Sequence, residues 1–326
     1  MIFSRDLGID LGTSTTLIAD RKGNILINEP SVVAVDVKSK RVLATGGEAK
    51  RMIGRTPGSI VPVMPIRSGV IADFDMTADM LHDFMSRSNS RNVFTKTRVV
   101  ISVPSGVTEV ERRAVEDAVR AAGAQEVELM DAPMAAALGA GLPVFEATGS
   151  MIVDIGGGTC DIAVVSLGGV ASCRSIKVAG DAFDEAIVNY MKRKHSLLIG
   201  ERTAEDIKLK IGSAAEYDGE AVMEVRGRNL EDGLPGSAEI SSSDIRYVLQ
   251  DPVDAIIIAV KETLEVTLPE LAADIMDRGV YLTGGAARLR GLKDRLEAEI
   301  HIPVVVPDKP AECVVKGAAA KLRRVR

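Results

Sequence analysis

Two turns rich in glycine and hydroxyl side chains contain the residues best suited to hold phosphate. Residues 9–16 read IDLGTSTT and residues 153–160 read VDIGGGTC, so each turn follows an apolar segment that ends at Asp10 or Asp154. Glycine lets backbone N–H groups approach phosphate oxygens, and a run of such amides forms an anion-binding concavity. The hydroxyl groups add donors, and each aspartate could hold Mg²⁺ through water.

The two turns form an internal repeat. Asp10 and Asp154 stand 144 residues apart, and a returning apolar segment follows each turn, at residues 17–19 and 162–165. A single turn of this kind is more often an ordinary hairpin, because Gly, Asp and Thr are common in turns. Two copies in the same strand context indicate a duplicated phosphate site instead.

The elements that must position these turns follow an alternating pattern. Strands alternate with helices along the chain, which predicts an α/β fold with covered sheets. We expect a strand pair at 31–37 and 41–45, a proline-rich crossover at 57–65, and a helix at 77–85. In the second half we expect a helix capped by Thr203, an apolar helix at 252–264 and a strand at 278–283.

One helix start has a specific signature. Thr108 and Glu111 form a capping box, in which a hydroxyl and a carboxylate satisfy backbone donors reciprocally. The predicted helix ends at Gly123, a usual stop residue. Its apolar residues, at helical spacing, are Val110, Ala114, Ala118 and Ala122.

Composition limits the possible functions. The chain has 326 residues, enough for about two or three domains, and a net charge of −6, which argues against a nucleic-acid binder. Its three cysteines, Cys160, Cys173 and Cys313, have no metal-ligand spacing and are expected to be reduced. No secretory signal or membrane-spanning run is predicted, because no apolar run approaches about 20 residues. Peripheral membrane contact stays open.

The two turns resemble the phosphate motifs of the superfamily of actin, sugar kinases and heat-shock chaperone ATPases. Residues 282–287, LTGGAA, look like the adenosine motif of that superfamily. Within it the chain resembles the MreB/Mbl family, through NEPSVVA at 28–34, GVIADF at 69–74 and IGERTAE at 199–205. The resemblance runs from Asp6 to about Gly317.

The resemblance implies an actin-like, ribonuclease-H-like duplicated ATPase fold with a nucleotide cleft between two similar domains. The first domain would span residues 1–145, with a small subdomain at 32–65, and the second 146–311, with a small subdomain at 180–245. A C-terminal helix at 312–326 would return to the first. The resemblance also implies head-to-tail filaments, paired antiparallel, that lie in the cytoplasm at the inner face of the membrane. There they would organise cell-wall synthesis and rod shape together with membrane proteins.

The resemblance also implies roles for residues in the cleft. ATP and Mg²⁺ are the expected ligands, with Asp10 and Asp154 holding the metal through water and Asp154 also ordering the attacking water. Glu205 and Lys208 would contact the ribose and the adenine from one helix face, although a solvated ion pair explains their spacing equally well. The full set expected to bind the nucleotide is Gly12, Thr13, Ser14, Thr15, Gly156, Gly157, Gly158, Thr159, Glu205, Asp206, Ile207, Lys208, Gly284, Gly285, Ala286 and Ala287.

One departure from the family concerns hydrolysis. Relatives carry a water-orienting Glu directly before the proline of Glu-Pro-Met-Ala-Ala-Ala, whereas here Ala132 precedes Pro133. A methyl group cannot orient water for in-line attack. Asp131 is the neighbouring candidate for this catalytic role, or else a helix N-cap. Cys160 and Ala286 also differ, from the usual Thr and Gly. The sequence therefore predicts ATP binding with slow turnover, or turnover by a rearranged site.

Two surfaces are expected to serve the filament. Val93 and Phe94 lie in a polar loop where relatives insert a small apolar loop into the bilayer, or they fold back on their own domain. Two apolar residues bind weakly, so a filament would bind by avidity. The helix at 109–122 resembles the contact between paired protofilaments, and core packing explains its apolar residues equally well.

Three other functions are alternatives to a hydrolysing filament. A sugar kinase would need a sugar pocket beside the phosphates, and kinases of this fold usually carry longer insertions. A chaperone ATPase would need a peptide-binding domain, for which residues beyond 317 leave no room. The third is a scaffold of the same family that assembles with ATP but hydrolyses little of it.

Overall fold

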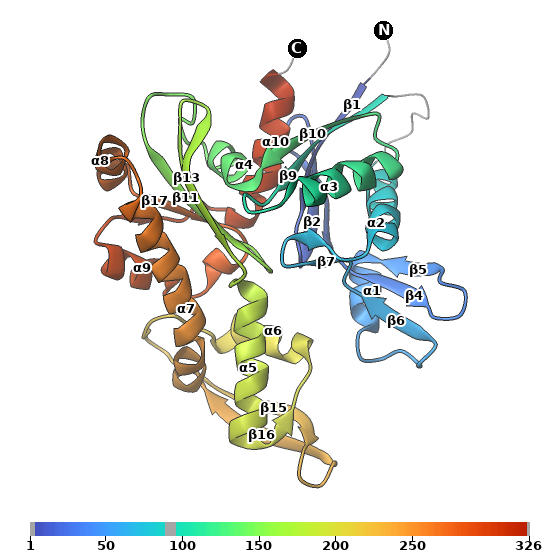
Figure 1. The fold of residues 1–326 in the computed structure, drawn as a ribbon. Helices are drawn as coiled ribbons and strands as arrows, with labels where there is room; N and C mark the ends of the chain where they lie inside the picture. Colours follow the sequence, from blue (N-terminus) through green and yellow to red (C-terminus); the bar gives the residue numbers. More distant parts are fainter. Residues whose placement is uncertain (1–3, 89–95, 325–326) are drawn as a thin grey trace.

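Two five-stranded sheets with the same strand order form the centres of the two halves of the molecule (Figure 1). The structure is a computed structural model that describes residues 4–88 and 96–324. The first sheet has the order β10-β9-β1-β2-β3, formed by β1 (Ser4–Leu11), β2 (Thr15–Asp20), β3 (Ile25–Pro30), β9 (Lys96–Val103) and β10 (Glu126–Asp131). The second has the order β13-β12-β11-β17-β18, formed by β11 (Ser150–Ile155), β12 (Cys160–Ser166), β13 (Gly169–Ile176), β17 (Val280–Thr283) and β18 (Val304–Val305).

The repeat seen in the two turns therefore extends to whole sheets. In each half three consecutive strands pair antiparallel, and a later strand pairs parallel with the first of them. The phosphate turns are the β1–β2 and β11–β12 connections. The α/β expectation is confirmed, with strand pairs where the two hairpins were predicted.

Two short helices lie between the sheets. α4 (Ala132–Gly139) follows β10, and α10 (Cys313–Arg324) comes after β18, and both contribute to one core cluster with Val100 of the first sheet and Ile152 of the second. The helices approach closely because each has a glycine at the crossing. A Cβ on Gly317 would lie 1.8 Å from the Ala135 carbonyl oxygen, and α10 also lies against β1.

The remaining helices cover the outer faces. In the first half these are α2 (Phe74–Arg87) and α3 (Glu109–Ala121), whose buried side chains share a core with β1 and β9. In the second half they are α7 (Ser242–Glu265), α8 (Pro269–Arg278), η1 (Ala286–Arg288), α9 (Leu292–Ile300) and η2 (Pro310–Glu312). Within the described ranges no helix is both long and apolar enough to cross a membrane.

A smaller sheet projects from each half, on the two lower limbs of Figure 1. The first limb is formed by β4 (Val33–Asp36), β5 (Val42–Thr45), β6 (Ile60–Val63) and α1 (Gly46–Met52), followed by the hairpin β7 (Ile66–Arg67) and β8 (Val70–Ile71). The second contains α5 (Gly180–His195), β14 (Leu197–Leu198), α6 (Glu201–Ile211), β15 (Val222–Asn229) and β16 (Pro235–Ser241). The domain limits given above stay predictions.

Four local expectations were wrong. Residues 57–65 do not simply cross over, because β6 pairs with β4. Thr203 lies inside α6, which Gly200 precedes as N-cap. The apolar helix begins ten residues before Pro252 and continues through it, because buried residues on both sides, such as Leu249 and Ile256, share one core. A further helix, α8, was not predicted.

The capping box is confirmed, but the core face of its helix differs from the expected one. Thr108 and Glu111 exchange both capping hydrogen bonds at the start of α3. Val110 is 79% exposed, whereas Val115 and Val119 are buried. The true core face is rotated, because α3 packs against α2 and β10.

Candidate functional site

A cavity of about 570 Å³ lies between the two halves, and both phosphate turns line it. Most residues expected to bind the nucleotide lie on its wall, namely Gly12, Thr13, Ser14, Thr15, Gly156, Gly157, Gly158, Thr159, Glu205, Lys208, Gly284, Gly285 and Ala286. Three do not. Ile207 and Ala287 are buried in the core of the second half, and Asp206 is exposed on another face of α6.

The two turns contact each other across the cavity. A Cβ on Gly157 would lie 1.9 Å from Ser14 Oγ, so only glycine permits this approach. Ser14 Oγ donates to Asp181 Oδ1 at 3.1 Å, which joins the first turn to the start of α5. Thr13 Oγ1 accepts from the backbone N–H of Gly69 at 2.9 Å, so the β7–β8 hairpin supports the same turn. The sequence repeat is thus also a spatial juxtaposition.

Two carboxyl groups face the cavity from the ends of β1 and β11. Ser102 Oγ donates to Asp10 Oδ1 at 3.1 Å, and Thr283 Oγ1 donates to Asp154 Oδ1 at 2.8 Å. Removal from water raises the pKa of Asp10 to about 6. Removal from water, followed by the charge of Asp10, raises the pKa of Asp154 to about 8. The two groups would be stabilised in their charged form by a cation between them.

These carboxyl groups fit the predicted magnesium. Mg²⁺ characteristically uses one or two carboxylates and keeps several waters while it bridges phosphates, where it neutralises charge. Within residues 4–88 and 96–324, no group of three or more His, Cys, Asp or Glu side chains is arranged to hold a metal. Magnesium at Asp10 and Asp154 through water stays a prediction.

α6 presents Glu205 and Lys208 to the cavity, but they do not pair with each other. Lys208 Nζ donates to Asp184 Oδ2 at 2.8 Å and to the Gly180 carbonyl oxygen at 3.0 Å, both on α5. Glu205 Oε2 accepts from Lys50 Nζ at 2.7 Å. Because Lys50 lies on α1 of the other limb, this ion pair closes the mouth of the cleft.

The expected adenosine motif follows β17. At Gly284, φ is +87°, and a Cβ there would lie 2.1 Å from the Ile155 carbonyl oxygen. Only glycine allows this crossing of β17 against β11. Gly285 and Ala286 then line the cavity at the start of η1.

Asp131 does not take the place of the missing glutamate. Ala132 is buried and lines the cavity, whereas Asp131 does not. The Asp131 carboxylate accepts from Arg112 Nη1 at 2.9 Å. Asp131 does occupy the N-cap position of α4, but its side chain makes no capping hydrogen bond. Both roles expected for Asp131 are therefore contradicted, because α3 brings an arginine to it.

One buried carboxyl group on the cavity wall was not predicted from the sequence. Asp161 is buried and stands opposite Asp154 in the β11–β12 register, where the first half has Leu17 opposite Asp10. Its Oδ1 accepts from the Ser105 backbone at 3.2 Å, and burial raises its pKa. Comparing the two repeats one position further would have revealed Asp161.

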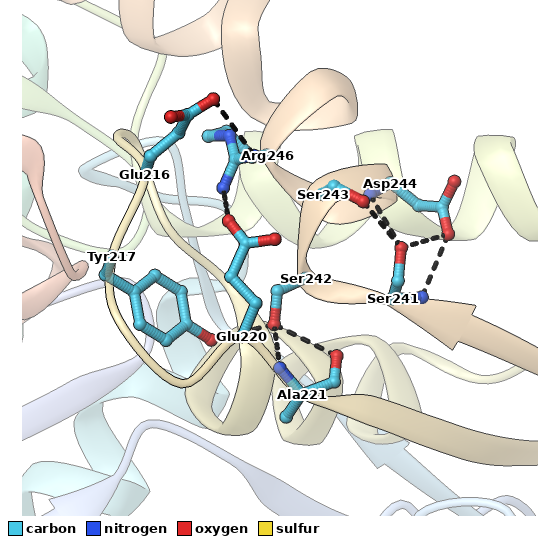
Figure 2. A network of polar contacts seen from close by, with 9 residues as sticks. All are labelled: Glu216, Tyr217, Glu220, Ala221, Ser241, Ser242, Ser243, Asp244 and Arg246. Atoms are coloured by element: carbon cyan, nitrogen blue, oxygen red, sulfur yellow. Dashed lines mark hydrogen bonds and ion pairs between the residues drawn. The ribbon is translucent and has the colours of Figure 1, made fainter.

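The loop after α6 is held firmly beside the cavity. Figure 2 shows Arg246 between Glu216 and Glu220, and Ser242 bonded to the backbone of Ala221. Tyr217 on this loop lies under the guanidinium group of Arg290, at 4.0 Å from its ring centroid, and Arg290 lines the cavity. Val93 and Phe94, predicted to touch the membrane, lie outside the described residues.

The fold and the cleft define an actin-like protein with two facing phosphate turns. The MreB/Mbl protein family model matches residues 4–326, and the chain belongs to the MreB/Mbl family. It is 50% identical to the cell shape-determining protein MreB of Escherichia coli (strain K12), over 99% of this chain and 95% of that protein. It is 47% identical to the cell shape-determining protein Mbl of Bacillus subtilis (strain 168), over 98% and 96%.

Solved structures agree on the fold. MreB 5 of Spiroplasma citri bound to AMPPNP superposes with a TM-score of 0.92 at 38% identity, over 98% of this chain and 96% of that one. A MamK double helical filament superposes with a TM-score of 0.84 at 20% identity, over 99% and 100%, which shows the shared fold alone.

Proposed function

We propose that this chain binds ATP with magnesium in its cleft and forms filaments that determine cell shape. The observation that carries the proposal is the contact between the two phosphate turns, with Gly157 against Ser14 at the cavity. Each turn presents backbone amides and hydroxyls to one space, which suits a chain of phosphates. The relatives named as cell shape-determining proteins support the role, and the Spiroplasma relative bound to AMPPNP or ADP supports the ligand.

The proposed filaments run head to tail, pair antiparallel and lie in the cytoplasm against the inner face of the membrane, where they meet cell-wall synthesis proteins. Val93 and Phe94 are the proposed membrane contact. Replacing both with serine should abolish co-sedimentation of filaments with liposomes while filaments still form. Unchanged co-sedimentation would reject the contact.

We infer further that the filament binds ATP but hydrolyses it slowly. Ala132 offers no polar atom at the cavity wall, and Arg112 already pairs with Asp131. Without a group that orients water, positioning and charge stabilisation are the remaining catalytic contributions. The scaffold function, with little hydrolysis, is therefore the second candidate.

The test combines electron microscopy with phosphate release, for ATP, ADP and no nucleotide. Filaments with slow phosphate release are expected. Ala132→Glu should raise release at least about tenfold, because a positioned acid–base group contributes that much or more. Asp131→Asn is the matched control and should change little. Rapid release that Asp131→Ala abolishes would contradict the proposal of slow turnover, and absence of ATP binding would contradict the whole function.

A further inference from the structure

Asp184 of α5 has a buried oxygen with no partner at the wall of the cavity. Its side chain is 16% exposed, and its Oδ2 accepts from Lys208 Nζ at 2.8 Å. Its Oδ1 is buried and makes no hydrogen bond in the described part of the chain. More than nine in ten buried polar groups in proteins are bonded, so such an atom calls for a donor. Since Asp184 lines the cavity, a bound ligand can supply that donor.

The position of Asp184 indicates which part of a nucleotide it would meet. α5 begins against the second phosphate turn, because the backbone N–H groups of Gly180 and Asp181 donate to the carbonyl oxygens of Gly156 and Gly157 at 3.1 and 2.8 Å. Asp184 follows Asp181 by three residues, about 4.5 Å along the helix axis. With phosphates on the turns, the next group of a nucleotide, its ribose, lies beside Asp184.

The other carboxylate considered for this contact is already engaged. Glu205, which the family resemblance assigns to the ribose, pairs with Lys50 at 2.7 Å across the cleft. Lys208 also reaches the Gly180 carbonyl oxygen at 3.0 Å, so it holds Asp184 from one side and leaves Oδ1 toward the cavity. A carboxylate is an acceptor only, and a ribose hydroxyl is a suitable donor.

We propose that Asp184 is a specificity-determining residue that accepts a hydrogen bond from a ribose hydroxyl, so that the cleft selects ribonucleotides over deoxyribonucleotides. This inference rests on the proposed binding of ATP. A site built to bond a hydroxyl rejects the analogue that lacks it, because the buried acceptor is then left unpaired.

Isothermal titration calorimetry of the full chain with magnesium tests this, using ATP, 2′-deoxy-ATP and 3′-deoxy-ATP. The wild type should bind at least one deoxy analogue about tenfold more weakly than ATP. Asp184→Ala should bring that ratio to within about twofold, and Asp184→Asn, which keeps a neutral acceptor, should give an intermediate ratio. Glu185→Gln, an equal charge change on the exposed side of α5, should keep the wild-type ratio.

Two results would overturn the inference while the proposed function stands. The first is equal wild-type affinity for all three nucleotides. The second is an Asp184→Ala protein that binds all three more weakly by the same factor, because Asp184 would then act only through Lys208. If Asp184→Ala does not fold, the ratio of Asp184→Asn decides. A wild type that binds no ATP would instead defeat the proposed function.

Discussion

The thermal stability of the nucleotide-free protein should fall as pH rises from 6 to 8, and Asp154 should account for much of the fall. Its side chain is only 8% exposed, and removal from water together with the charge of Asp10 raises its pKa to about 8. In the unfolded chain the group has an ordinary pKa near 4. Between these values the folded protein keeps a proton that the unfolded chain releases.

The sign and the magnitude follow from this difference. The contribution of Asp154 to stability is fully present below about pH 4 and is lost as pH rises through about 8. From pH 6 to pH 8 the loss is about 2 kcal/mol, because each unit in which one proton is held only by the folded state costs about 1.4 kcal/mol and the group is half ionised at pH 8. For a chain of this size that is roughly 4 °C in melting temperature.

The assay is differential scanning fluorimetry across pH 6 to 8, with and without magnesium and ATP. Asp154→Asn should lose most of the slope, and Asp218→Asn, at an exposed position, should keep it. Magnesium with ATP should stabilise the wild type more at pH 8 than at pH 6, because the cation replaces the proton. An Asp154→Asn slope equal to that of the wild type would refute the reasoning.

Three other predictions concern the cleft and its hinge. Gly157→Ala should weaken ATP binding at least about tenfold in calorimetry, because its Cβ would displace the hydroxyl of the facing turn, whereas Gly156→Ala, with its nearest atom at 3.4 Å, should bind nearly normally. Gly317→Ala should lower stability by about 1–3 kcal/mol in urea titrations, since it separates α4 from α10, while Gly58→Ala, with open space around it, should not; equal midpoints would contradict the contact. Lys50→Ala should speed nucleotide release by no more than about fivefold in stopped flow, and 0.5 M salt, roughly enough to screen an exposed pair, should give the wild type the same rate. A salt-insensitive wild type would show that this ion pair does not hold the cleft closed.

Much of the candidate site was predictable because its chemistry is local in sequence. A phosphate turn needs glycine, hydroxyls and a strand-end carboxylate within a few residues, so the two turns can be recognised and paired from their residues alone. The capping box at Thr108 is local in the same sense. The longer motifs of 28–34, 69–74 and 199–205 likewise indicated the MreB/Mbl family, which the comparisons show.

What the sequence determined by itself was therefore the duplicated pair of phosphate turns and the family. Only the tertiary structure decided which side chains meet across long separations. Arg112 reaches Asp131, Lys50 reaches Glu205, and Lys208 leaves one oxygen of Asp184 unpartnered. These pairings depend on how helices pack on separate sheets and limbs, a relation that no periodicity along the chain encodes. The two turns contact each other for the same reason, since the packing of the halves places Gly157 against Ser14.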